Sequence, residues 1–245
     1  MIEIARPGVQ YYADRIRSGE PFSFVKYADG ELRLIIPGLS LNPNLLKTCY
    51  HPGCSELQYT FTHAWQDDNY IVGLFHLEWF RRDGRSLLDG VLEWLACNVP
   101  DLHWHDGAVW ERALLAGTLY PIVRAIQEQP LPLVLIGPQC IADIGKVAHW
   151  DIAQHIVTHV SHAWLDRYAV LEQVAAIREP TFFILSAGPT AKFVIHKAWP
   201  WIGRQSFLID FGSTWNAFTT PIRRFHNKLS QETLERCLTG MRENI

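Results

Sequence analysis

Short runs of consecutive apolar residues, each followed by a stretch with helical spacing, are the feature that most constrains the fold of this chain. Within most of these runs apolar residues do not alternate with polar ones, which is typical of strands buried on both faces of a parallel sheet. The runs lie at residues 22–28, 71–75, 133–136, 156–160, 182–185 and 206–210. Alternation of such strands with helices implies right-handed crossovers and helices on both faces of the sheet. The sequence therefore predicts an α/β protein with a doubly wound, mostly parallel sheet.

The segments between these runs show the spacing of amphipathic helices. Helices are predicted over residues 8–18, 76–96 with a break near Gly84, 107–127 with a bend at Pro121, and about 230–242. Residues 101–106 are predicted to form a polar connector, and residues 37–54 a long loop. No low-complexity segment or charge run divides the chain, so residues 1–245 are predicted to form a single domain.

Composition excludes several classes of protein. The net charge of −3 gives no overall basic footprint for nucleic acid. Five scattered cysteines form no disulfide framework, which favours a reducing compartment. The chain shows no signal-peptide pattern and no apolar run of membrane-spanning length, so a cytoplasmic location is expected. Cys49, His51 and Cys54 lie close together, but no second pair with zinc-ligand spacing accompanies them.

Two carboxylates, Asp29 and Glu31, directly follow the first buried strand, with only Gly30 between them. Acidic groups at the carboxyl end of a strand lie where open α/β sheets bind ligands. Their oxygens are suitable ligands for Mg²⁺ or Mn²⁺ and would leave positions open for phosphate oxygens. In the alternative interpretation the tripeptide is a turn in which Asp29 caps a helix and Glu31 lies in its first turn.

A second candidate site is the loop at residues 186–192, Ser-Ala-Gly-Pro-Thr-Ala-Lys, between a buried strand and a helix. Gly188 permits tight backbone geometry, and Pro189 suits the first helical position. Free amides at a helix start attract phosphate, and Ser186, Thr190 and Lys192 offer polar contacts. The loop matches neither a P-loop nor a dinucleotide-binding fingerprint, and a plain strand–helix turn remains the alternative.

Two further strand ends belong to the same predicted edge. His162 follows the strand at 156–160 and is a candidate base for an acceptor hydroxyl, or else a structural histidine. Asp210 and Gly212 end the last strand, where Asp210 can contact a ribose or sugar hydroxyl. Residues 223–228, Arg-Arg-Phe-His-Asn-Lys, form a basic cluster that either binds an anion or is a solvated loop.

These segments together resemble the GT-D type of glycosyltransferase. Residues 27–31, Tyr-Ala-Asp-Gly-Glu, resemble its Asp-x-Glu signature, and residues 184–192 resemble its Ser-x-Gly-Pro-Thr-Ala segment. Residues 208–213, Leu-Ile-Asp-Phe-Gly-Ser, resemble its Asp-x-Gly tract. The resemblance covers about residues 20–218. Lys26 and Ala28 depart from the arginine and glycine usual in that family, and residues 213–216 lack its histidine and acidic residues.

The resemblance implies a Rossmann-like fold and transfer of a sugar from a nucleotide-sugar donor, with UDP-sugars the expected class. It also implies that Asp29 and Glu31 hold Mn²⁺ or Mg²⁺. The donor would then be bound by residues of the two later segments: Ser186, Gly188, Pro189, Thr190, Lys192, Asp210 and Gly212. His162 is the expected base. Whether configuration at the sugar is inverted or retained is left open.

The sequence leaves several functions and acceptors open. The expected acceptor is a hydroxyl of a glycan or glycoprotein. The basic cluster at residues 223–228 instead suggests DNA carrying hydroxymethylated bases, against which the net charge argues. A non-catalytic nucleotide-binding domain is a further alternative. A methyltransferase would need a glycine-rich loop after the first strand, where this chain has Asp-Gly-Glu.

Overall fold

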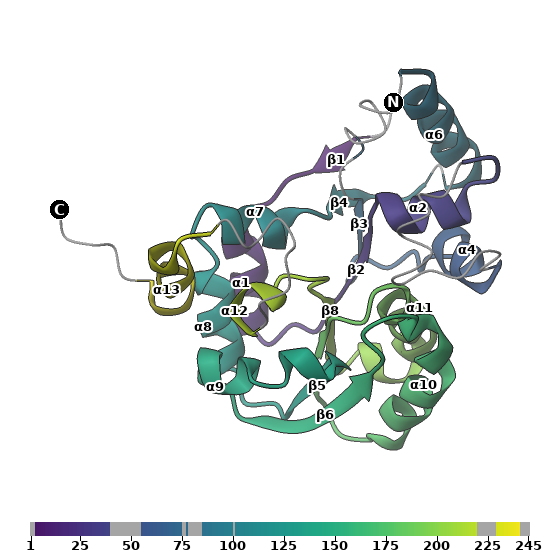
Figure 1. The fold of residues 1–245 in the computed structure, drawn as a ribbon. Coiled ribbons are helices and arrows are strands. Elements are labelled where there is room, and N and C mark those ends of the chain that lie inside the picture. Colours follow the sequence, from purple (N-terminus) through teal and green to yellow (C-terminus); the bar gives the residue numbers. More distant parts are fainter. Residues whose placement is uncertain are drawn as a thin grey trace.

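The fold is that of a computed structural model, which describes residues 3–39, 55–74, 77, 85–99, 101–219 and 229–240. Eight strands form one sheet in the order β1-β4-β3-β2-β8-β7-β5-β6, and every recorded pairing is parallel (Figure 1). The strands are β1 (Ile4–Ala5), β2 (Ser23–Tyr27), β3 (Tyr70–Leu74), β4 (Trp104–Asp106), β5 (Leu133–Pro138), β6 (Ile152–Thr158), β7 (Phe182–Leu185) and β8 (Phe207–Asp210). The predicted doubly wound parallel sheet is confirmed.

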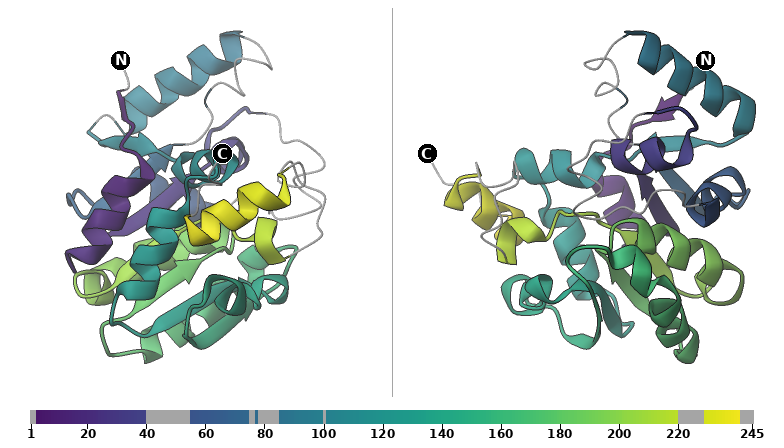
Figure 2. Two further views of the ribbon diagram at one scale, coloured as in Figure 1. Left: turned by 90° about the vertical axis from the view of Figure 1, so that its left-hand side faces the viewer. Right: turned by 45° about the vertical axis from the view of Figure 1, so that its right-hand side comes forward.

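Helices cover both faces of this sheet, as Figure 2 shows. The longer ones are α1 (Val9–Arg17), α4 (Ser55–Thr62), α6 (Arg85–Asn98), α8 (Tyr120–Glu128), α10 (Arg167–Ala176), α11 (Pro189–Ala198) and α13 (Gln231–Thr239). The shorter ones are α2 (Asp29–Ile35), α7 (Val109–Leu115), α9 (Ile144–Ala148) and α12 (Asn216–Thr219), with single turns η1 (Gln139–Ile141), η2 (Ala163–Asp166) and η3 (Trp199–Gly203). Helices α10 and α11 pack together on one face, and α1 and α8 on the other.

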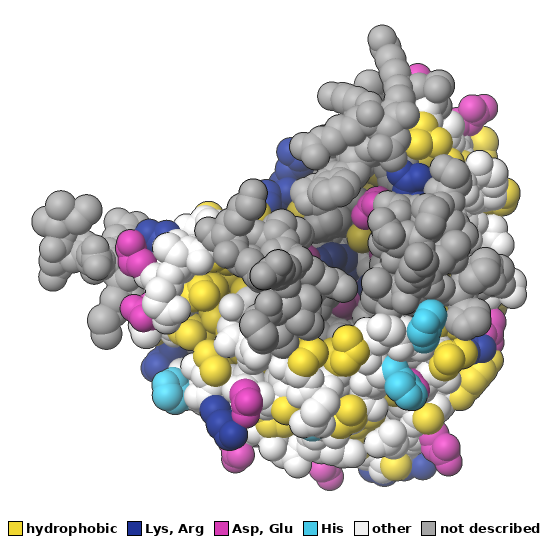
Figure 3. All heavy atoms as spheres, viewed as in Figure 1, with side chains coloured by type: hydrophobic (Ala, Val, Ile, Leu, Met, Phe, Trp, Pro, Cys, Tyr) yellow, Lys and Arg dark blue, Asp and Glu magenta, His cyan; other side chains and the backbone are white. Residues whose placement is uncertain are grey.

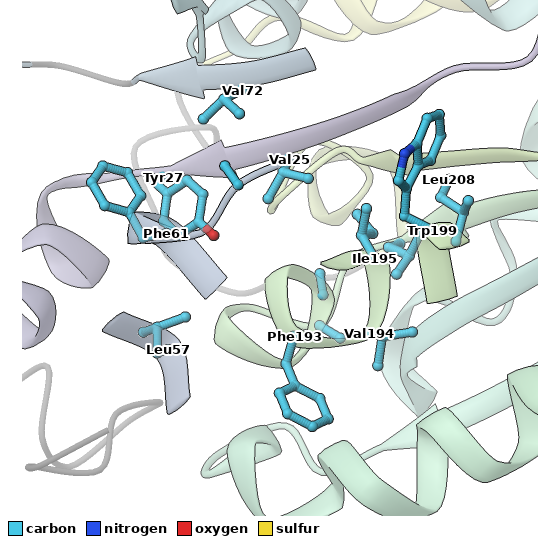
Figure 4. Packing of buried hydrophobic residues seen from close by; sticks show 14 of the residues in the cluster. Val25, Tyr27, Leu57, Phe61, Val72, Phe193, Val194, Ile195, Trp199 and Leu208 are labelled. Carbon is cyan, nitrogen blue, oxygen red and sulfur yellow. The ribbon is translucent and has the colours of Figure 1, made fainter. Parts of the chain in front are cut away.

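Neighbouring residues of the central strands point into two separate cores. Val25 and Leu208 belong to the core beneath α4 and α11, whereas Phe24 and Ile209 belong to the core beneath α1 and α8. Figure 4 shows part of the first core, where residues of β2, β3 and β8 meet those of α4 and α11. Successive side chains of a strand alternate between faces. Apolar residues at consecutive positions are therefore required by a sheet that is covered on both sides.

Three predicted segments differ from the structure. The strand predicted at residues 156–160 is β6, which begins earlier, at Ile152, and ends at Thr158. The single bent helix over residues 107–127 is wrong: α7 ends before Gly117, whose φ of +67° ends the helix, and Pro121 lies in the first turn of α8. There proline costs no hydrogen bond, so it starts a helix instead of bending one. The connector at residues 101–106 contains the short strand β4, which pairs with β1 and β3. Pairing with distant strands, not the local sequence, makes it a strand.

The order of the strands places a switch point between β2 and β8. From β2 the chain runs outward to β3 and β4, then crosses to β5 and β6 and returns through β7 to β8. Strand β8 pairs with β2 on one side and with β7 on the other. Ligands of open α/β sheets bind outside the carboxyl ends of the strands at such a point. A ligand-binding site is therefore expected at the carboxyl ends of β2, β8 and β7.

Some sequence predictions fall outside the described residues. These are the zinc alternative at Cys49, His51 and Cys54, the basic cluster at residues 223–228, and most of the loop at 37–54. Across the part of the chain that the structure describes, no helix combines the length and the apolarity that crossing a membrane requires.

Stability should fall at mildly acidic pH because of His196 on α11. Burial, with Lys197 and His63 nearby, lowers the pKa of His196 to about 4. Between the unfolded value of about 6.5 and this value, the unfolded chain binds a proton that the folded chain does not, so stability decreases as pH falls through that window. His196→Gln should lose less melting temperature between pH 7 and pH 5 than the parent. The exposed His103→Gln should behave like the parent, and equal slopes in all three proteins would contradict the assignment.

Candidate active site

The first component of the site is the start of α2, directly after β2. Asp29 is the first residue of this helix and is half-buried, whereas Glu31 is buried. Glu31 Oε2 accepts a hydrogen bond from the backbone N–H of Ala28 at 3.0 Å. This contact is the reach-back half of a capping box. The helix-capping interpretation is therefore right for Glu31 and wrong for Asp29, because the N-cap is Ala28. Asp29 is the more accessible carboxylate.

The second component is the start of α11, directly after β7. Gly188 precedes the helix with φ 55° and ψ −134°, a conformation that side chains disfavour, and open space surrounds the position of its absent Cβ. Pro189 occupies the first helical turn, as predicted. The Thr190 hydroxyl donates to the Ala163 carbonyl at 2.6 Å. The buried Ser186 hydroxyl has no hydrogen-bond partner among the described residues.

The third component is the end of β8. Asp210 is fully buried, and its Oδ1 accepts a hydrogen bond from the Gly212 N–H at 2.9 Å. Gly212 has a φ of +58°, and a Cβ there would lie 2.5 Å from Lys26 Nζ. Glycine is therefore required at this turn both by the backbone angle and by the space.

Lys192 joins all three components. Its side chain is 2% exposed, and its Nζ lies 2.7 Å from Asp210 Oδ2 and 3.1 Å from Glu31 Oε1. The same ammonium donates to the Gly188 carbonyl at 3.1 Å. Three acceptors match the three N–H donors of an ammonium. Residues from three separate predicted segments therefore meet in one cluster, and the ion pairs of Lys192 with the two carboxylates were not predicted.

The charges in this cluster follow from the same contacts. Burial alone lowers the pKa of Lys192, but the carboxylates of Asp210 and Glu31 outweigh burial and raise the pKa above its usual value. Lys192 is therefore a cation at neutral pH. Burial, together with the charge of Glu31, raises the pKa of Asp29. Both effects are those expected for ionisable groups in a poorly solvated site.

A second buried ion pair lies next to this cluster and was missed by sequence reasoning. Lys26, near the end of β2, forms an ion pair with Glu111 of α7, and both side chains are buried. The position of the absent Cβ of Gly212 is also close to Glu111 Oε1, at 3.5 Å. A lysine inside an otherwise apolar strand was the available signal, because such a charge needs a partner.

His162 directly precedes the residue whose carbonyl the Thr190 hydroxyl contacts. It is partly buried, has a left-handed φ of 60°, and precedes Ala163, whose carbonyl accepts from Thr190. This conformation is uncommon for residues other than glycine, although histidine, like asparagine and aspartate, adopts it more often than most. The segment that carries His162 therefore lies against the start of α11, and the role of His162 as a base stays a prediction.

The predicted divalent cation does not fit the arrangement of these side chains. Glu31 Oε2 and Asp210 Oδ1 accept backbone hydrogen bonds, and Glu31 Oε1 and Asp210 Oδ2 lie 3.1 Å and 2.7 Å from the Lys192 ammonium. In the described ranges no three histidine, cysteine or acidic side chains gather as a metal site. A cation on Glu31 would also face the Lys192 ammonium, and like unit charges 4 Å apart repel by about 4 kcal/mol at an effective dielectric constant of about 20. Asp29 alone remains accessible.

Figure 3 shows the face of the molecule seen in Figure 1. Near its middle is a hollow in which basic and acidic side chains are visible. A separate cavity of about 380 Å³ is lined by Ser55, Glu56, Tyr59 and Lys197. In it Glu56 forms an ion pair with Arg167, 2.7 Å apart. This cavity belongs to α4 and the end of α11, and not to the start of α11, where Gly188 lies.

Comparison with known proteins supplies information on the fold. No protein-family model matches the chain, and no curated protein sequence matches it. A solved chain described as a new glycosyltransferase (DUF1792) from Streptococcus sanguinis aligns over 96% of this chain and 94% of its own length, with a TM-score of 0.64 and 14% identity.

Two further solved structures of the domain of unknown function 1792 align over 95% of this chain and 94% of theirs. One, described as having a distinct glycosyltransferase fold, has a TM-score of 0.62, and the other, a selenomethionine form, has 0.59; both are 15% identical to this chain. Identity this low is informative about architecture only. The parallel sheet with helices on both faces is therefore the fold of the DUF1792 domain.

Proposed function

We propose that this protein transfers a glycosyl group from a nucleotide-sugar donor, with UDP-sugars the expected class, to an acceptor hydroxyl of a glycan or glycoprotein. One observation carries the proposal: Asp29, Glu31, Asp210 and the open start of α11 converge on the β2–β8 switch point. The likeness of the fold to a chain described as a glycosyltransferase supports it. The proposal does not depend on the divalent cation that the sequence predicted.

The proposed chemistry follows from the charge that develops during transfer. As the bond between the sugar and the nucleoside diphosphate breaks, negative charge accumulates on the phosphate oxygens. The dipole of the ten-residue helix α11 stabilises such charge at its start, and open space beside Gly188 lets phosphate approach the backbone. Asp29 would contact hydroxyl groups of the donor. The acceptor hydroxyl attacks the anomeric carbon as His162 takes its proton.

A donor screen tests the proposal. UDP, GDP and dTDP, and then the sugar esters of the nucleotide that binds, are added in thermal-shift assays, and slow donor hydrolysis is followed as release of nucleoside diphosphate. We expect one nucleotide class to raise the melting temperature and its sugar ester to be hydrolysed. Binding without any hydrolysis or transfer would support the non-catalytic alternative, and no binding at all would contradict the proposal.

Asp29→Asn should separate the function of this carboxylate from its effect on stability. We expect donor hydrolysis to fall about 100-fold, the scale of losing one electrostatic contact to the reacting groups. Because burial raises the pKa of Asp29, the charged form is not favoured by folding, and its loss should leave the melting temperature unchanged or slightly higher. The control is Asp68→Asn, an exposed residue just before β3, at the opposite end of the sheet. Equal hydrolysis by both variants would remove Asp29 from the site.

A further inference from the structure

Lys192 lies where a long side chain can reach back over the start of α11. It is the fourth residue of the helix, and helical side chains lean toward the N-terminus, so its ammonium meets the Gly188 carbonyl one turn earlier. From there the ammonium also contacts Asp210 of β8 and Glu31 of α2. One group therefore links the segments that follow β2, β7 and β8.

Two buried carboxylates in this cluster could bind a cation, and the positive charge between them is supplied by a side chain of the protein itself. Glu31 and Asp210 are 3% and 0% exposed, and buried carboxylates need a positive partner. A metal ion commonly fills that role among carboxylates at phosphate-binding sites. Here the Lys192 ammonium fills it, 2.7 Å from Asp210 Oδ2 and 3.1 Å from Glu31 Oε1.

We propose that the Lys192 ammonium takes the place of a divalent cation between Glu31 and Asp210, so that this edge of the sheet works without a resident metal ion. In the donor complex, the fixed positive charge offsets the two carboxylates that would otherwise repel a nucleoside diphosphate. The remaining stabilisation comes from the backbone N–H groups of α11. The statement about donor binding rests on the proposed function, whereas the statement about the cation does not.

Manganese binding to the wild-type protein is the first test. Free Mn²⁺ is measured by electron paramagnetic resonance while the protein is titrated, and melting temperatures are compared in Mn²⁺, Mg²⁺ and EDTA. We expect no stoichiometric binding and equal melting temperatures. Stoichiometric Mn²⁺ binding that EDTA reverses would overturn the proposal.

Lys192→Met is the second test. The variant leaves the carboxylates of Glu31 and Asp210 facing a space from which the ammonium has been removed, so we expect it to bind Mn²⁺ at least about tenfold more tightly than the wild type. Mn²⁺ should also raise its melting temperature. Lys197→Met on the same helix, whose ammonium lies over the Tyr59 ring 5.3 Å from the centroid, should gain neither property. Equal Mn²⁺ affinity in the wild type and in Lys192→Met would count against the inference.

A refolding experiment covers the case in which Lys192→Met does not fold alone, because the variant lacks the counter-ion of two buried carboxylates. The variant is then refolded with Mn²⁺ or with EDTA, and recovery of the folded state only with Mn²⁺ supports the proposal. If neither condition restores the folded state, the Mn²⁺ titration of the wild-type protein decides whether Lys192 replaces a cation.

Nucleoside diphosphate binding separates failure of the inference from failure of the proposed function. The nucleotide that stabilises the wild type is titrated in EDTA and in Mn²⁺. Equal affinity in the two conditions supports the inference. Binding that needs Mn²⁺ overturns it and leaves the proposed function standing. If no nucleotide binds in either condition, the proposed function fails, and the Mn²⁺ titrations alone decide whether Lys192 replaces a cation.

Discussion

Asp210→Asn should be among the most destabilising single substitutions in this protein, at about 3–5 kcal/mol in the free energy of unfolding. Asp210 is fully buried and lies 2.7 Å from the Lys192 ammonium. An asparagine in its place removes one of two negative charges and leaves the buried cation with Glu31 alone. Because a domain is stable by only about 5–15 kcal/mol, this loss is a large part of the total.

Urea unfolding followed by circular dichroism measures this effect. The matched control is Asp143→Asn, whose carboxylate forms an exposed ion pair with Lys146 at 2.9 Å. Exposed pairs of this kind contribute at most about 1 kcal/mol, so the control should stay close to the parent. Similar losses in the two variants would mean that the Lys192 cluster does not stabilise the fold.

The second large effect is expected from the ion pair between Lys26 and Glu111. Lys26→Met leaves the buried Glu111 carboxylate without this partner, and we expect a loss of about 3–5 kcal/mol. The double variant Lys26→Met with Glu111→Leu removes both charges and fills the space with apolar atoms. We expect it to recover most of the loss, because a buried pair replaced as a unit is often close to neutral.

The double-mutant cycle is measured by denaturant unfolding of the parent, the two single variants and the double variant. Arg124→Met with Glu128→Leu, an exposed pair on α8 at 2.6 Å, provides the comparison and should show little coupling. Additive losses at Lys26 and Glu111 would contradict the interpretation that the two charges compensate each other inside the protein.

Most of the fold was predictable because its signals are local. Apolar runs without alternation predicted six of the eight strands, all except β1 and β4, and Ser230 and the spacing after it predicted α13. Strand β4 was not predictable, since three residues of polar and aromatic character become a strand only when β1 and β3 pair with them. Pro121 was misinterpreted because proline has opposite effects at the start and in the middle of a helix.

The candidate site was likewise predictable from the sequence only in part. The sequence alone determined that Asp29, Glu31 and Gly188 follow buried strands and that Asp210 ends one, because a strand end and its turn residues are adjacent in the sequence. Only the tertiary structure decided that Lys192 meets both Glu31 and Asp210, and that Lys26 meets Glu111. The order of strands in the sheet brings together side chains that are far apart in the chain. Once they are buried, the cost of an uncompensated charge fixes which of them pair.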